Sequence, residues 1–258
     1  MDVYVMGVSI HPAADVISDA RLEEMAYRTA RAALDDAGIE RRQIDHVTLA
    51  GSDEIDARGI SSMLLAAPSG AYLKDEMRVS DSGLTGLHLG AMRVASGHLQ
   101  LGLVVSWNQS SVGPLEDIGR MRAEPFFLRP IGLNFAIADG LFASAMAERH
   151  GITERAVGER VRLRLAAAAK NPRAVRRAVP ELDAMQAGRR VAVNPSGGAW
   201  AQNPYFCTGL VHAAEAALQV AGRAGGHQVA GARRALAHGS SGFAQQTHGF
   251  VVMEGIEA

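Results

Sequence analysis

The stretch VSDSGLTGLHLGAMRVASGHLQLGLVV, residues 79–105, decides the fold that we expect for this 258-residue chain. A strand at 77–80 leads into a Gly/Ala-rich segment at 84–95, typical of a helix buried on all sides, and then into an apolar run at 101–107 that predicts a central strand. The later stretch YFCTGLVHAAEAALQV, residues 205–220, contains the same Thr-Gly-Leu triplet, an Ala-rich helix and then a strand at 232–237. Two copies of strand, Thr-Gly-Leu turn, buried helix and strand predict a duplicated fold with its two central helices packed together.

The rest of the N-terminal region alternates between β-rich and helical segments. Residues 3–10 and 46–50 are apolar and β-branched enough to predict strands. Between them, apolar residues recur at helical spacing over 22–37, and Gly38 follows where a helix stops. This βαβ order predicts the α/β class, with a buried parallel or mixed sheet.

Composition excludes several classes of protein. Lys and Arg total 26 against 27 Asp and Glu, so the net charge of −1 gives no general attraction to nucleic acid. The single cysteine, Cys207, excludes an internal disulfide and a metal site built from thiolates, and we expect no metal. The sequence shows no signal peptide and no apolar run long enough to cross a bilayer, so we expect a cytoplasmic protein without membrane or nucleic-acid partners.

The central part of the chain has a different character. We expect an N-terminal half at 1–115, a helical and basic connecting region at 116–190, and a C-terminal half at 191–258. Basic residues outnumber acidic ones between Arg155 and Arg190, which fits either a solvated helix face or a contact with an anionic ligand or partner. Pro172 and Pro180 predict breaks in this region.

Five segments together resemble the thiolase superfamily, specifically thiolase-like proteins of the lipid-transfer-protein type. They lie at residues 3–39, 79–105, 142–174, 194–222 and 232–242, in the order of the family. The resemblance implies a thiolase-like duplicated, layered α/β fold with two central buried helices. In this family a much longer stretch separates the K-N-P and N-P-S-G-G motifs than separates Lys170-Asn171-Pro172 from Asn194-Pro195-Ser196-Gly197-Gly198 here. The second half is therefore expected to be truncated, which would expose sheet edges and imply a partner chain or a rebuilt sheet.

The resemblance also implies that the usual catalytic cysteine is missing. Thiolases carry a nucleophilic cysteine at the N-terminus of the first buried helix, where the helix dipole favours a thiolate. Alignment of Val79 and Gly86 with that motif places Gly83 at the nucleophile position. Ser82 is either a substitute nucleophile or a helix N-cap. Cys207, at the start of the second buried helix, is either a thiol with a lowered pKa or a small buried apolar residue.

Other family motifs supply the remaining candidate residues. Asn203 stands where the family has a histidine, and its amide would donate to an oxyanion unless it is a turn residue. His238, between an apolar strand and a Gly/Ser loop, is a candidate acid or base. Tyr205 is a candidate auxiliary acid or a packing residue. The candidate catalytic residues are thus His238, Asn203 and Tyr205, and the candidate substrate-binding residues are Ser82, Gly197, Gly198, Gly239 and Ser240.

Three functions remain open from the sequence. The first is a degenerate thiolase-fold subunit of a hetero-complex that makes or breaks carbon–carbon bonds, or transfers acyl groups, on CoA thioesters. Its partners would be a catalytic thiolase-like chain and an OB-fold protein with a zinc ribbon, and no cofactor would be tightly bound. The second is an active, cysteine-independent lyase, aldolase or acyltransferase that uses His238. The third is a non-catalytic carrier of acyl-CoA or lipid.

Overall fold

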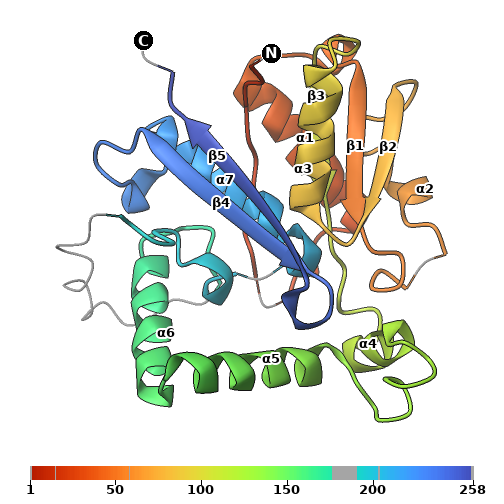
Figure 1. The fold of residues 1–258 in the computed structure, drawn as a ribbon. Helices are drawn as coiled ribbons and strands as arrows, with labels where there is room; N and C mark the ends of the chain where they lie inside the picture. The colour runs from red at the N-terminus through yellow and green to blue at the C-terminus, as the bar shows by residue number, and fades with distance from the viewer. Residues whose placement is uncertain (1, 15, 58, 176–190, 203, 257–258) are drawn as a thin grey trace.

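The computed structural model describes residues 2–14, 16–57, 59–175, 191–202 and 204–256 and shows a layered α/β fold (Figure 1). The elements of the N-terminal region are α1 (Leu22–Ala37), η1 (Arg41–Gln43), β1 (His46–Gly51), α2 (Ser62–Leu65), β2 (Asp75–Ser80), α3 (Gly83–Ala95) and β3 (Gly102–Ser106). The elements that follow are α4 (Leu115–Arg122), α5 (Phe135–His150), α6 (Glu154–Ala168), η3 (Gly198–Trp200), η4 (Tyr205–Cys207), α7 (Thr208–Val220), η5 (Gly225–His227), β4 (Arg234–Ser241), η6 (Phe243–Gln245) and β5 (Thr247–Glu254).

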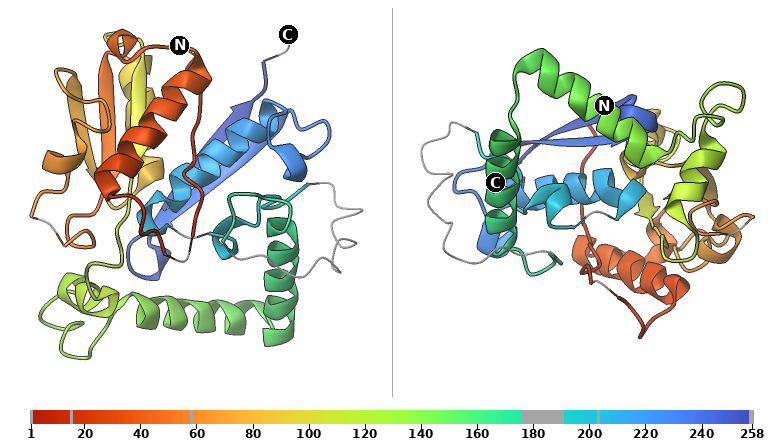
Figure 2. Two further views of the ribbon diagram at one scale, coloured as in Figure 1. Left: turned by 180° about the vertical axis from the view of Figure 1, so that it is seen from behind. Right: turned by 90° about the horizontal axis from the view of Figure 1, so that it is seen from below.

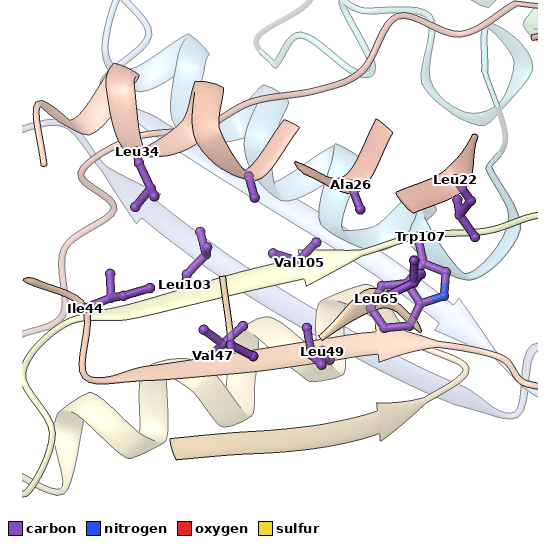
Figure 3. Packing of buried hydrophobic residues seen from close by; sticks show 12 residues of the cluster. Leu22, Ala26, Leu34, Ile44, Val47, Leu49, Leu65, Leu103, Val105 and Trp107 are labelled. Atoms are coloured by element: carbon purple, nitrogen blue, oxygen red, sulfur yellow. The ribbon is translucent and has the colours of Figure 1, made fainter. Parts of the chain in front are cut away.

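The first sheet is parallel, with strand order β2-β1-β3. Every residue of the central strand β1 is buried. Side chains alternate between its faces: Val47 and Leu49 pack with Leu103 of β3 against α1, as Figure 3 shows. On the opposite face, Gly86 of α3 lies so close to Ala50 that an added Cβ would be 3.1 Å from the alanine methyl group. The sheet is therefore covered by α1 on one face and by α3 on the other.

The predicted helix at 22–37 is confirmed, and Gly38 ends it in the left-handed conformation with φ 67°. The predicted strand at 3–10 is wrong. This segment runs extended beside α1 (Figure 1), and a Cβ on Gly7 would lie 2.5 Å from the Ala37 nitrogen. The amide of Val8 donates to Asp36 at 2.8 Å instead of to a neighbouring strand. Because no described segment pairs with its other side, β3 is an edge strand and not the expected central one.

Helices α3 and α7 cross at very short range, as the repeated motif predicts. A Cβ on Gly209 of α7 would be 2.8 Å from Leu84 Cβ, and a Cβ on Gly83 of α3 would be 2.8 Å from Leu210 Cβ. Two other expectations are wrong. Residues 191–202 form turns and η3 but no strand before α7, and α3 is exposed at Met92 and so is not buried on all sides.

The second sheet is a two-stranded antiparallel hairpin, β4-β5. Its inner face, with Ala237 and Val251, packs on Leu84 of α3 and Ala213 of α7. The layers thus run in the order α1, first sheet, α3 with α7, and hairpin (Figure 1). Within the described residues no element plays the role of α1 on the outside of the hairpin, where Val252 is 71% exposed. Within the described residues, one face of the hairpin and both of its strand edges are therefore open.

Residues 115–168 are largely helical, as predicted, and α4, α5 and α6 form the lower and left border of the molecule in Figure 1. Pro172 lies beyond the end of α6, consistent with a helix break, whereas Pro180 lies outside the described residues. In the described part of the chain, no helix combines the length and the apolar character needed to cross a membrane.

Candidate functional site

The N-terminal ends of α3 and α7 meet beside the carboxyl end of the first sheet, where the family alignment places its nucleophile. Gly83 is the first residue of α3 and is buried. A Cβ there would be 2.8 Å from Leu210 Cβ and 2.9 Å from the Ser106 hydroxyl oxygen. Real carbon–carbon contacts lie near 3.5–4.0 Å. The position therefore holds neither a side chain nor space for one.

Ser82, the neighbouring candidate, caps the helix. Its hydroxyl accepts a hydrogen bond from the amide of Thr85 at 3.1 Å, and its extended backbone is that of an N-cap residue. No histidine, aspartate or glutamate among the described residues is hydrogen-bonded to this hydroxyl. A serine nucleophile needs such a base, so the geometry favours the capping role.

Cys207 ends η4 and directly precedes α7. Burial raises the pKa of its thiol to about 12; an interaction with Ser106 opposes this increase and the negative charge of Asp56 adds to it. The alternative of a lowered pKa at the helix terminus is therefore wrong, because burial disfavours the charged thiolate. Cys207 is a small buried apolar residue at neutral pH.

A salt-bridge network that the sequence analysis missed lies directly beside this junction. Arg122 of α4 binds Asp81 through both terminal nitrogens, at 2.7 and 2.9 Å, and also contacts Glu54 at 2.8 Å. Its guanidinium lies 5.6 Å from the ring centre of Phe206. Arg122 therefore joins the residue before Ser82 to the residue before Cys207, and fixes the two helix starts relative to each other.

A second part of the network is more deeply buried. Asp56 accepts hydrogen bonds from the indole of Trp107 at 2.7 Å and from the amide of Gln109 at 3.1 Å. Burial raises the pKa of Asp56, while these hydrogen bonds oppose the increase. Arg78 pairs with Asp53 at 2.5 Å and lies 5.3 Å from the Trp107 ring centre. One signal for this cluster was present in the sequence, since acidic residues follow a buried parallel strand, where α/β folds place polar groups.

A groove of about 2320 Å³ opens between the two halves of the molecule. The N-terminal segment 2–14, α1, β3 and α3 line one side, and α7 and β5 line the other. Much of its wall is apolar, for example at Leu22, Leu87, Val104, Leu210 and Val251. Polar groups enter from the carboxyl end of β3 and from the segment before α7, namely Ser106, Asn108, Gln202 and Tyr205. The groove is therefore a largely apolar space whose polar end lies at the helix junction described above.

Of the two predicted catalytic residues that the structure describes, His238 and Tyr205, only Tyr205 is found in this groove wall. It has a left-handed backbone, with φ 50°, which is unfavourable for a bulky side chain. Its ring packs edge-on against Phe206 at 5.6 Å. Burial raises the pKa of Tyr205, and the negative charge of Asp139 raises it further, so the phenol stays protonated at neutral pH.

His238 lies elsewhere. It is in the middle of β4, not after the strand as expected, and it belongs to the outer face of the hairpin. Its Nε2 lies 3.0 Å from Nδ1 of His248, and its ring is 4.8 Å from that of Phe250. Burial lowers the pKa of His238, and the charges of His248 and His212 lower it further. His238 and Tyr205 do not form one site here, because only Tyr205 lines the groove.

The predicted substrate-binding residues make close contacts within the chain. Gly197 has φ 96° and approaches α6 so closely that a Cβ would be 2.6 Å from Ala168 Cβ. Gly239 faces inward against Gly209 of α7. Gly198 has φ 61°, and the Ser240 hydroxyl bonds to Gln245. Asn203, a predicted catalytic residue, lies outside the described residues. The contribution of the glycines and of Ser240 to substrate binding stays a prediction.

A buried ionic cluster surrounds Glu215 in the second half of α7. Glu215 accepts hydrogen bonds from Arg173 at 2.8 Å and 3.3 Å and lies 2.8 Å from Nε2 of His227. Burial by itself would raise the pKa of Glu215, but the bonds from His227 and Arg173 lower it. The described residues contain no group of three or more histidine, cysteine, aspartate or glutamate side chains placed to hold a metal ion.

Comparison with known proteins gives two kinds of match. Residues 176–254 match the family model described as thiolase C-terminal domain-like. Among solved structures, the Ltp2–ChsH2(DUF35) aldolase is 24% identical, with a TM-score of 0.51 over 72% of this chain and 49% of that chain. The 3-oxoacyl-[acyl-carrier-protein] synthase III of Aquifex aeolicus VF5 is 20% identical, with a TM-score of 0.33 over 38% of this chain and 33% of that chain. The chain matches none of the curated proteins with which it was compared.

This chain thus spans about half the length of the aldolase chain that it resembles. The α3–α7 pair between two sheets agrees with the fold expected from the motifs. The fold of this chain is therefore similar to that of a thiolase-like protein, and its residues 176–254 match the thiolase C-terminal domain-like family.

Proposed function

We propose that this chain is a thiolase-fold subunit of a complex that acts on CoA thioesters, and that it does not form an acyl-cysteine itself. The observation that carries the proposal is the packing at Gly83, where Leu210 and Ser106 occupy the space that a nucleophilic side chain would need. A thiolase nucleophile must also ionise near neutral pH. The one thiol of this chain is buried, and its pKa is raised to about 12.

Two features support a role beside a catalytic partner. The groove between the halves has an apolar wall that suits an acyl chain, and its polar end lies at the helix junction. The outer face of the hairpin and both hairpin edges are uncovered in the described structure. The aldolase among the similar solved structures is named as an assembly of two proteins. A catalytic thiolase-like chain is the partner that we propose, with an OB-fold zinc-ribbon protein as a further one.

The test measures whether an acyl group becomes covalently attached to this chain. Purified chain is incubated with a series of acyl-CoA thioesters, and the intact protein is weighed by mass spectrometry after denaturation. We expect no acyl adduct on this chain, whereas a thiolase with its cysteine, treated in parallel, carries one. Turnover should require co-purification with a thiolase-like chain. An adduct that persists on this chain, and disappears in Cys207→Ala, would contradict the proposal.

Tyr205 favours a second candidate, a cysteine-independent carbon–carbon lyase. Cleavage of the C2–C3 bond of a 3-hydroxyacyl-CoA passes the 3-hydroxyl proton to water and gives a ketone or aldehyde and a thioester enolate. Carbon C2 of the enolate must then gain a proton. Tyr205 lines the groove and remains protonated because burial raises its pKa. In this scheme its phenol donates that proton. The likeness to a solved aldolase is consistent with such a reaction class.

Matched phenol-to-phenyl variants distinguish the two functions. Tyr205→Phe removes the acid, and Tyr27→Phe makes the same change on the exposed surface of α1. If this chain is the lyase, Tyr205→Phe lowers kcat by at least about 100-fold, the ordinary contribution of a positioned acid, and Tyr27→Phe does not. Equal activity of both variants in the complete complex would exclude Tyr205 as the acid and favour the subunit role.

A further inference from the structure

Two histidines face each other on the outer side of the hairpin. His238 of β4 and His248 of β5 both occupy exposed positions of their strands. Phe250 is the direct cross-strand partner of His238, and His248 precedes Phe250 by two residues, so the two histidines are diagonal neighbours on one face. Figure 1 shows the hairpin in front of α7, and the left view of Figure 2, from behind, shows α7 in front of the hairpin. The two imidazoles therefore lie on the face that points away from α7.

The chain itself holds the two imidazoles together. Nε2 of His238 lies 3.0 Å from Nδ1 of His248, and the ring centres are 5.2 Å apart. The ring of Phe250 stacks on His238 at 4.8 Å and lies 6.4 Å from His248. Behind them, Nδ1 of His212 on α7 lies 2.9 Å from the carbonyl oxygen of His238, which fixes the backbone of β4 at this point. A ligand that needs both nitrogens thus finds them already side by side, which lowers the entropy cost of binding.

Two facing imidazole nitrogens suit a transition-metal ion, because neutral imidazole is the commonest protein ligand of such ions. In the hydrogen bond between two neutral imidazoles, one ring donates and the other accepts. When the donating ring moves its proton to its other nitrogen, both facing nitrogens present a lone pair, and no proton leaves the two rings. Exposed side chains turn freely on a short timescale, so the two lone pairs can point to one shared ion. A metal ion can therefore replace the hydrogen bond.

The distance between the two nitrogens favours one geometry of the ion. Imidazole nitrogens bind a metal ion such as zinc at about 2.0–2.1 Å, so two nitrogens 3.0 Å apart form an angle of about 94° at the ion. A tetrahedral zinc site has angles of about 109° and needs the nitrogens about 3.3 Å apart. The square-planar or tetragonal coordination of Cu²⁺ and Ni²⁺ has angles of about 90°. Affinity for nitrogen ligands is also highest for Cu²⁺ among these divalent ions. Both arguments favour a copper-type ion over zinc.

We propose that His238 and His248 form a two-nitrogen binding site for Cu²⁺ or Ni²⁺ on the outer face of the hairpin. The ion joins β4 to β5 through one imidazole from each strand. The described part of the chain places no group of three metal-binding side chains here, so water fills the remaining positions of the ion. Because the two ligands come together only in the folded hairpin, the bound ion stabilises the fold. The site is separate from the groove and does not depend on the proposed action on CoA thioesters.

Binding is measured by titration calorimetry of the full chain, without an affinity tag, with Cu²⁺, Ni²⁺ and Zn²⁺. We expect one Cu²⁺ per chain, bound more tightly than Zn²⁺, and an electron paramagnetic resonance spectrum with coupling to two nitrogens. His238→Gln and His248→Gln should each raise the Kd for Cu²⁺ by at least about 10-fold, since loss of even an outer partner of a metal ligand has that effect. His98→Gln, at an exposed position after α3, is the matched control and should bind like the wild type.

A gain of affinity tests the arrangement in a second way. Phe250→His adds a third imidazole next to His238 and should lower the Kd for Cu²⁺ by at least about 10-fold. In the wild type, free Cu²⁺ at 100 times its Kd should raise Tm by about 5–11 °C, and the same concentration should not raise the Tm of His238→Gln. Cys207 does not compete for the ion because it is buried. Circular dichroism without metal checks that each variant is folded.

Four results would overturn the proposal. These are a wild-type chain that does not bind Cu²⁺, equal affinity in the wild type and both glutamine variants, an equal loss of affinity in His98→Gln, and no gain of affinity in Phe250→His. Tighter binding of Zn²⁺ than of Cu²⁺ would contradict the geometry inferred from the distance between the two nitrogens.

Discussion

Replacement of Gly83 by cysteine restores the residue that thiolases carry at this position, and the structure predicts loss of stability without gain of activity. The new Cβ would lie 2.8 Å from Leu210 Cβ and 2.9 Å from the Ser106 hydroxyl, about 1 Å inside ordinary contact distance. The contacts come from α7 and β3, so relief requires movement of a helix or a strand. Overpacking of this kind costs about 1–3 kcal/mol.

For a chain of this size, 1 kcal/mol corresponds to about 2–4 °C in Tm, so Gly83→Cys should melt about 2–12 °C below the wild type. Differential scanning calorimetry measures the shift, and intact-mass analysis after incubation with acyl-CoA measures acylation. Gly83→Ala should lose about as much stability, because it adds the same Cβ without a thiol. The matched control is Gly158→Cys, at an exposed position of α6 with no atom within 4 Å of the added Cβ, and it should not be destabilised.

The reasoning is refuted if Gly83→Cys both melts at or above the wild-type temperature and becomes acylated by acyl-CoA. That result would mean that the helix junction has space for a nucleophile, and that only the side chain is missing.

Three other outcomes are expected. The Cys207 thiol, with its pKa raised to about 12, should react with a disulfide reagent only after unfolding, and rapid reaction in the native state would contradict its burial. Burial lowers the pKa of His46, so the folded state disfavours its charged form. The free energy of unfolding should therefore keep its full value above the unfolded pKa of about 6.5 and fall as the pH decreases below it. Urea unfolding at a series of pH values measures this dependence, and His46→Leu should flatten it. Glu215→Ala leaves Arg173 and His227 without their shared carboxylate and should destabilise the chain by about 3–5 kcal/mol. Glu148→Ala, at an exposed position, is the control. A loss below about 1 kcal/mol in Glu215→Ala would show that the cluster is not important for stability.

The candidate site was only partly predictable. Gly83 was placed at the nucleophile position from its motif, and Ser82 as a helix cap from its residue type. The Arg122–Asp81 salt bridge joins residues 41 positions apart, and no local sequence pattern predicts such a pair. His238 was expected in the loop after a strand, because the Gly/Ser run that follows it is typical of a loop, yet pairing with β5 extends β4 through that run to Ser241.

The sequence by itself determined the features that depend on near neighbours. Helix α1 and its end at Gly38, and the helix pair α3 and α7, follow from apolar spacing, from glycine and from hydrogen bonds between residues four apart. The tertiary structure alone decided that residues 3–10 do not join the sheet, that the Cys207 thiol is buried, and that His238 faces outward. Strand pairing and the electrostatic surroundings of a side chain depend on which distant segments meet, and that is set by the packing of the whole chain.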